Sequence, residues 1–146
     1  MAADIVFLDT GVLLAASVEL HPNHQAAMAY LSDVAARRRP MCISRQVCRE
    51  FLVVLTREPV AGRTFTAEEV IASLEFWTSI CTVLDDDRFV HDELLRLAER
   101  HEVRGKAVHD CNIVATMITY AVKHLATRNA SDFERYKTEI AVEAVP

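Results

Sequence analysis

The chain has 146 residues, a length at which one domain can bury a hydrophobic core without disulfides or structural metals. Half of the residues are apolar and a quarter are charged, which excludes a disordered polar chain. The net charge of −5 excludes a broad basic surface, so any binding of nucleic acid must be local. Glycine and proline are scarce, which favours long helices with few strands over a turn-rich β protein.

The cysteines and the apolar runs indicate the compartment. The chain has four cysteines, Cys42, Cys48, Cys81 and Cys111. They form no Cys-x-x-Cys pair and have no zinc-finger spacing to a histidine. We therefore expect buried thiols in a reducing compartment. The apolar runs are too short to span a bilayer, and no segment resembles a signal peptide. These features predict a cytoplasmic protein.

The first predicted element is a central strand. Residues 5–8 form a continuous apolar run, which is typical of a strand covered on both faces. A short helix is predicted over 12–17 and a longer one over 23–38. The second helix ends in the basic run 37–39, which we expect to be a solvated helix terminus favoured by the helix dipole.

Capping residues mark the following helices. Ser44 can cap a helix over 45–57, and Thr66 with Glu69 forms a capping-box pattern. The aspartates 85–87 suggest a metal site, but acidic residues at a helix start are the interpretation we favour. The remaining predicted elements are strands at 41–43, 80–84, 124–127 and 140–142, and helices at 88–101 and 108–122.

This alternation of strands and helices predicts one α/β domain over residues 1–146. Such an order implies a mostly parallel sheet with helices on both faces. In sheets of this kind, ligands bind beyond the carboxyl ends of the strands. Two acids are predicted at that edge, since Asp9 follows the first strand and Asp132 follows the fourth. A helix cap remains the alternative for Asp9, and a polar turn for Asp132.

Two more acids interrupt the apolar faces of helices. In the helical projection, Glu50 is surrounded by the apolar residues Val47, Phe51, Val53 and Val54. Asp110 is followed on its own helix face by Ile113, Val114, Met117 and Ala121. A buried carboxylate is costly unless it is paired or bound to a cation. The alternative for Glu50 is a salt bridge to Arg45, Arg49 or Arg57, and the alternative for Asp110 is a helix cap.

Together, the four carboxylates predict a metal site. Carboxylates drawn together repel one another unless cations compensate them, and oxygen ligands without histidine or cysteine favour Mg²⁺ or Mn²⁺. Mg²⁺ often shares its coordination sphere with phosphates, so hydrolysis of a phosphodiester by metal-activated water is the expected chemistry. Thr10, Thr127 and Asn129 would orient ligands and waters.

Four segments resemble the PIN-domain nucleases and, within them, the VapC-type toxins of bacterial toxin–antitoxin pairs. The family's four acids fall on Asp9 in IVFLDTGVLLAA, Glu50 in SRQVCREFLVVL, Asp110 in GKAVHDCNIVATM and Asp132 in LATRNASDFERY. The last segment also carries the polar site groups Thr127 and Asn129. Gly11 departs from the asparagine that many relatives have there, which removes a local hydrogen bond.

The resemblance implies a three-layer α/β/α sandwich with a central four- or five-stranded parallel sheet. It also implies a Mg²⁺- or Mn²⁺-dependent endoribonuclease that leaves a 5′-phosphate and a 3′-hydroxyl, a homodimer, and a small antitoxin whose tail covers the acidic pocket. Contacts to RNA phosphates are expected from Arg45, Arg49, Arg104, Lys106 and Arg128, although each can equally be a solvated charge.

Two other functions fit the same pattern. One is a non-catalytic module of the same fold that binds RNA or a protein. The other is a phosphotransferase or dehalogenase-like enzyme with Asp9 as the nucleophile. That chemistry usually needs a lysine near the last strands, and neither Lys106 nor Lys123 stands in the expected context.

Overall fold

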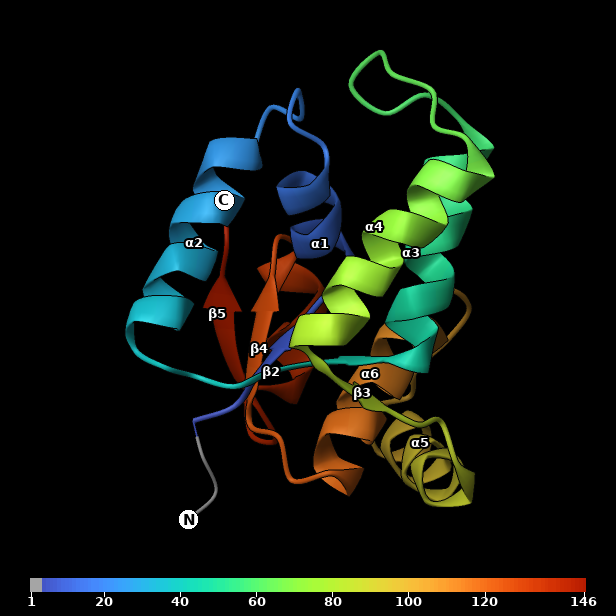
Figure 1. The fold of residues 1–146 in the computed structure, drawn as a ribbon. Coiled ribbons are helices and arrows are strands. Elements are labelled where there is room, and N and C mark those ends of the chain that lie inside the picture. Colours follow the sequence, from blue (N-terminus) through green and yellow to red (C-terminus); the bar gives the residue numbers. More distant parts are fainter. Residues whose placement is uncertain (1–3) are drawn as a thin grey trace.

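The computed structural model describes residues 4–146, which form a five-stranded parallel sheet between two layers of helices (Figure 1). The strand order is β3-β2-β1-β4-β5, and each neighbouring pair is parallel. The three-layer α/β/α architecture is therefore confirmed. The strands are β1 (Val6–Leu8), β2 (Met41–Ser44), β3 (Thr82–Leu84), β4 (His124–Thr127) and β5 (Ala141–Ala144).

The direction of the chain decides which helices cover each face. The chain moves outward from β1 through β2 to β3, then returns to β4 and β5, so right-handed crossovers place the two helix sets on opposite faces. In Figure 1 the first four helices lie above the strands and the next two below them. The helices are α1 (Thr10–Ser17), α2 (His24–Ala36), α3 (Arg45–Arg57), α4 (Ala67–Ile80), α5 (Arg88–Arg100) and α6 (Ala107–Thr119), with a 3₁₀ helix η1 (Ala130–Tyr136).

Local capping chemistry sets most of the helix starts, as predicted. Ser44 Oγ accepts from the backbone N–H of Val47 at 3.3 Å, and the capping box at the start of α4 is complete. Asp87 caps α5 through two backbone N–H groups, so the helix-start interpretation of the aspartate run is confirmed. Helix α1 starts at Thr10, two residues before the predicted start, because Asp9 caps it.

The core is apolar and contains the cysteines. All residues of β1 are fully buried, as expected for a strand covered on both faces. The four cysteines are free and buried, and burial raises the pKa of Cys42 and Cys81 to about 12. These thiols are therefore inert core residues. Within residues 4–146, no helix combines the length and the apolar character needed to cross a membrane.

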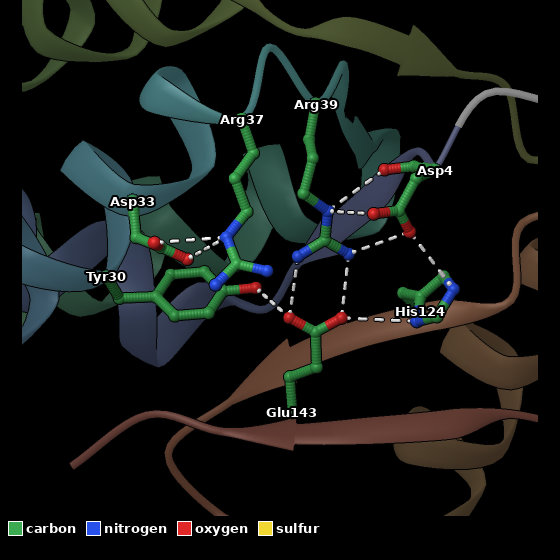
Figure 2. A network of polar contacts seen from close by, with 7 residues as sticks. All are labelled: Asp4, Tyr30, Asp33, Arg37, Arg39, His124 and Glu143. Atoms are coloured by element: carbon green, nitrogen blue, oxygen red, sulfur yellow. Dashed lines mark hydrogen bonds and ion pairs between the residues drawn. The ribbon is translucent and has the colours of Figure 1, made fainter.

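The prediction of a solvated basic run at 37–39 is wrong for Arg39. Its side chain is only 8% exposed and forms a bidentate pair with Glu143 of β5, at 2.8 and 2.7 Å (Figure 2). Arg39 also pairs with Asp4, Tyr30 donates to Glu143 at 2.7 Å, and His124 lies 3.2 Å from both acids. Glu143 is distant in sequence from Arg39, so the preference of basic residues for helix ends could not reveal this partner.

This cluster predicts a pH-dependent contribution to stability. The Arg39 hydrogen bonds are the main cause that lowers the pKa of Glu143 to about 2, so its contribution is complete above the unfolded pKa of about 4.5. As the pH falls from about 4.5 towards 2, that contribution is lost. We expect Glu143→Gln to reduce the free energy of unfolding by about 2 kcal/mol at pH 7, because it weakens charge-assisted hydrogen bonds to a buried guanidinium.

Urea unfolding of both proteins between pH 7 and pH 3 measures this effect. The difference between wild type and variant should narrow in acid. Asp33→Asn is the matched control, since Asp33 pairs with Arg37 on the exposed surface and such pairs contribute little. An equal loss in the two variants would contradict the assignment.

Candidate active site

The site is built around Asp9, directly after β1. Its backbone N–H donates to the carbonyl of Ala126 at 3.0 Å, which extends the pairing of β1 with β4. Its Oδ1 accepts from the N–H of Thr10 at 2.8 Å, and its Oδ2 accepts from the hydroxyl of Thr127 at 2.8 Å. Asp9 is thus both the cap of α1 and a carboxylate fixed at the carboxyl edge of the sheet.

Asp9 is buried, and its surroundings disfavour its negative charge. Desolvation raises its pKa above the usual value, and the charges of Glu50 and Asp132 raise it further. The hydrogen bonds from Thr127 and Thr10 oppose this shift. Within residues 4–146, no lysine, arginine or histidine forms an ion pair with Asp9. Its negative charge is therefore held only by neutral donors.

Glu50, on α3, is also held by neutral donors. Its Oε2 accepts from the hydroxyl of Thr10 at 2.8 Å, and its Oε1 accepts from the Gln46 amide at 2.9 Å. The salt-bridge alternative is wrong, because the nearby arginines pair with other acids: Arg45 with Asp85 at 3.0 Å, Arg49 with Asp86 at 3.9 Å and Arg57 with Glu58 at 3.2 Å. Val53, expected in the apolar arc, is 52% exposed, so Glu50 borders a surface groove rather than the core.

Asp110 lies in the first turn of α6 and is half-buried. Desolvation raises its pKa to about 6, with further contributions from the charges of Asp9, Asp132 and Glu50. The helix-cap alternative is wrong, because Lys106 occupies the N-cap position. In the described part of the chain, no residue donates a hydrogen bond to the Asp110 carboxylate. Asp110 is therefore less restrained than Asp9 and Glu50.

Asp132 lies in the first turn of η1, where a polar turn was the alternative prediction. It is exposed, yet its charge raises the pKa of both Asp9 and Asp110, so the structure brings it towards the other acids. Asn129 directly precedes η1 and donates its backbone N–H to the Thr127 hydroxyl at 3.1 Å. Of the predicted supporting residues, Thr10 and Thr127 contact the acids directly, whereas Asn129 acts through Thr127.

The donor set fits a hard divalent cation. It consists of carboxylate oxygens, its charges disfavour one another, and a bound cation would relieve that repulsion. Among residues 4–146, no group of three or more acidic, histidine or cysteine side chains is arranged closely enough to hold a metal as it stands. The acids therefore form a loose cluster that would have to tighten around a cation.

Gln46 is a site residue that the sequence analysis missed. Its side chain is buried, and its amide donates to Glu50 at 2.9 Å and to the carbonyl of His109 at 2.8 Å. Its oxygen accepts from Asn112 at 2.8 Å. Gln46 thus joins α3 to the start of α6, next to Asp110. The spacing of four residues between Gln46 and Glu50 was a usable signal, since such residues are neighbours on one helix face.

The five candidate RNA contacts are placed differently. Arg45 and Arg49 face the acidic loop at 85–86, and Arg128 donates to the Asn23 side chain at 2.7 Å. The aliphatic part of Arg128 also lies against Gly11, where a Cβ would meet it at 3.7 Å. Arg104 and Lys106 are exposed before α6, and neither forms an ion pair within residues 4–146.

The chain is an α/β domain with an acidic cluster at the carboxyl edge of its parallel sheet. The model of the PIN domain family matches residues 6–139. The chain therefore belongs to the PIN-domain family.

Solved structures of similar fold come from toxin–antitoxin systems. The chain is similar to VapBC2 from Rickettsia felis bound to a promoter DNA fragment, with 17% identity, 97% and 99% of the two chains covered and a TM-score of 0.71. It is also similar to DNA-bound VapBC from Salmonella typhimurium, with 21% identity, 95% and 96% covered and a TM-score of 0.67. VapC20 of Mycobacterium tuberculosis, described as a sarcin–ricin loop cleaving toxin, has 17% identity, 97% and 99% covered and a TM-score of 0.67. The comparison with curated proteins gave no significant match.

The contacts of Gln46 predict an effect on both stability and metal affinity. Gln46→Ala removes the hydrogen bonds to the carbonyl of His109 and to one oxygen of Glu50, so we expect a loss of about 2 kcal/mol in the free energy of unfolding. Affinity for Mn²⁺ should fall by about tenfold or more, as for other groups that orient metal ligands.

Urea unfolding and calorimetric titration with Mn²⁺ measure the two effects. Gln25→Ala is the control, since Gln25 lies exposed on α2. If Gln46→Ala loses stability but keeps the Mn²⁺ affinity of the wild type, Gln46 stabilises the fold without positioning a metal ligand.

Proposed function

We propose that the protein is a divalent-metal-dependent endoribonuclease in which Asp9, Glu50, Asp110 and Asp132 bind Mg²⁺ or Mn²⁺. The observation that supports this most is that burial and the charges of neighbouring acids raise the pKa of Asp9 and Asp110, while none of the four acids forms an ion pair with a basic side chain among residues 4–146. Membership of the PIN-domain family and the fold shared with a toxin described as cleaving the sarcin–ricin loop add to it.

The chain's own residues would have distinct tasks. When bound, the cation would activate water for attack on the phosphodiester and stabilise the leaving oxygen, giving a 5′-phosphate and a 3′-hydroxyl. Thr127 and Thr10 orient Asp9 and Glu50 through their hydroxyls. Burial and the neighbouring acids raise the pKa of Asp110 to about 6, and a bound cation would favour its charged form, so Asp110 would serve as a ligand of the cation.

Cleavage of RNA with Mg²⁺ or Mn²⁺ tests the proposal. We expect Asp9→Asn, Glu50→Gln and Asp110→Asn each to reduce the rate by about a hundredfold or more, because each removes charge from the cation site. Asp33→Asn should leave the rate unchanged, since Asp33 is exposed on α2. Equal activity in Asp9→Asn and wild type would refute the proposal. A calorimetric titration without Mn²⁺ binding would favour a non-catalytic module instead.

We further propose that the protein is the toxin of a type II toxin–antitoxin pair, forms a homodimer and is bound by a small antitoxin. Several structures of similar fold are complexes of such pairs. An apolar groove of about 400 Å³ between α2 and α4 is suited to an amphipathic antitoxin segment. Large apolar side chains are exposed there, including Met28 at 43%, Phe76 at 56% and Ile80 at 45%.

Expression with and without the adjacent small open reading frame tests the toxin role. Growth should stop only when the chain is expressed alone, and sequencing of RNA ends should then identify the target. Phe76→Asp should weaken the complex without loss of cleavage, because Phe76 lines the apolar groove and none of the four acids does. Toxicity that the neighbouring product does not relieve would contradict the pairing.

A further inference from the structure

A second groove begins at the candidate active site. It has a volume of about 430 Å³ and runs along one face of α3 and the start of α6. One of its walls is Glu50, so it opens directly beside a proposed metal ligand. Its lining residues are Gln46, Arg49, Glu50, Val53, Val54, Arg57, Lys106 and His109.

The groove is basic although the chain as a whole is acidic. It is lined by Arg49, Arg57 and Lys106 but by only one carboxylate, Glu50, while the whole chain has a net charge of −5. A protein of this charge can attract a polyanion only through such a local concentration of cations.

These cations are available to a ligand. Among residues 4–146, Arg57 pairs only with its exposed neighbour Glu58, and Arg49 lies 3.9 Å from Asp86 with most of its side chain exposed. Exposed pairs of this kind contribute little and are exchanged readily. Lys106 forms no ion pair with any residue from 4 to 146. Phosphate groups can therefore replace the present partners at small cost.

The floor of the groove is apolar. Val53 is 52% exposed and Val54 partly so, and both face a space large enough for a nucleotide. Gln46 is already bonded to Glu50, His109 and Asn112, so it forms a fixed wall rather than a ligand contact. An occupant must therefore combine negative charge with an apolar or planar face.

We propose that this groove holds the RNA nucleotides next to the cleaved bond. Arg49, Arg57 and Lys106 bind backbone phosphates, and a base or ribose packs on Val53 and Val54. Arg49 and Arg57 lie about 12 Å apart along the helix axis, so the groove is long enough to contact more than one nucleotide of an RNA chain. This inference rests on the proposed ribonuclease function and adds Arg57, Val53 and Val54 to the residues expected to contact RNA.

Binding of 5′-fluorescein hexauridylate, measured by anisotropy in calcium chloride, tests the groove separately from cleavage. We expect Arg57→Gln and Lys106→Gln each to weaken binding about three- to tenfold. Each should also reduce the slope of log Kd against log salt by about 0.7, the value for one phosphate contact on a single strand. Arg37→Gln is the matched control, since Arg37 also ends a helix and pairs with a local acid. Arg57→Lys should restore most of the binding.

The outcomes separate the groove from the proposed function. If wild type cleaves no RNA but binding still depends on Arg57 and Lys106, the ribonuclease proposal fails and the groove assignment stands. If both variants have wild-type affinity and unfold at the same urea concentration, the groove assignment is overturned even where cleavage persists. It is also overturned if Val53→Asp dissociates a dimer in sedimentation while Arg57→Gln binds RNA normally, since the face then joins two copies.

Discussion

The structure depends on carboxylates that are fixed in place without being neutralised. Asp9 and Glu50 accept hydrogen bonds from Thr127, Thr10 and Gln46, all of which are uncharged donors. An arginine in any of these places would fix the carboxylate equally well, but it would cancel the charge that attracts a cation. Neutral donors orient the acids and leave the negative charge of the carboxylates available to a cation.

This arrangement has a cost in stability. Burial and mutual repulsion raise the pKa of Asp9 and Asp110, so charging these groups at neutral pH opposes folding. A bound cation would reverse that effect and stabilise the folded state by mass action. The cluster of Arg39, Glu143 and Asp4 has the opposite design, since its charges are paired with one another. One small domain thus contains both paired and unpaired charges.

The sequence was sufficient for features that local chemistry determines. The buried run of β1, the capping residues Ser44 and Asp87, and the position of Asp9 after a strand all follow from patterns within a few residues. The carboxyl-edge rule for parallel sheets then indicated which acids would lie near one another. The sheet has five strands, and the resemblance to the PIN-domain nucleases implied four or five.

Features that depend on distant partners were missed. Arg39 lies in the connection between α2 and β2, and its pairing with Glu143, 104 residues away, explains its burial. The contact of Gln46 with the carbonyl of His109 spans 63 residues. The exposure of Val53 depends on where α6 begins relative to α3, which helical periodicity cannot reveal. The sequence pattern therefore identified the acids but not the groups that position them.

Residues that the fold restricts and residues that it leaves exposed differ in how freely they can change, and this affects how substrate choice can vary in this fold. Asp9 lies where β1 ends, and the sheet register and the cap of α1 restrict it. Arg57 and Val53, in contrast, are exposed on α3, and the fold places little demand on them. Structures with 17% to 21% identity to this chain share its architecture, so most surface positions can change without loss of the fold. If the groove binds RNA, its exposed face can be altered to select a different RNA while the carboxylates at the sheet edge stay fixed.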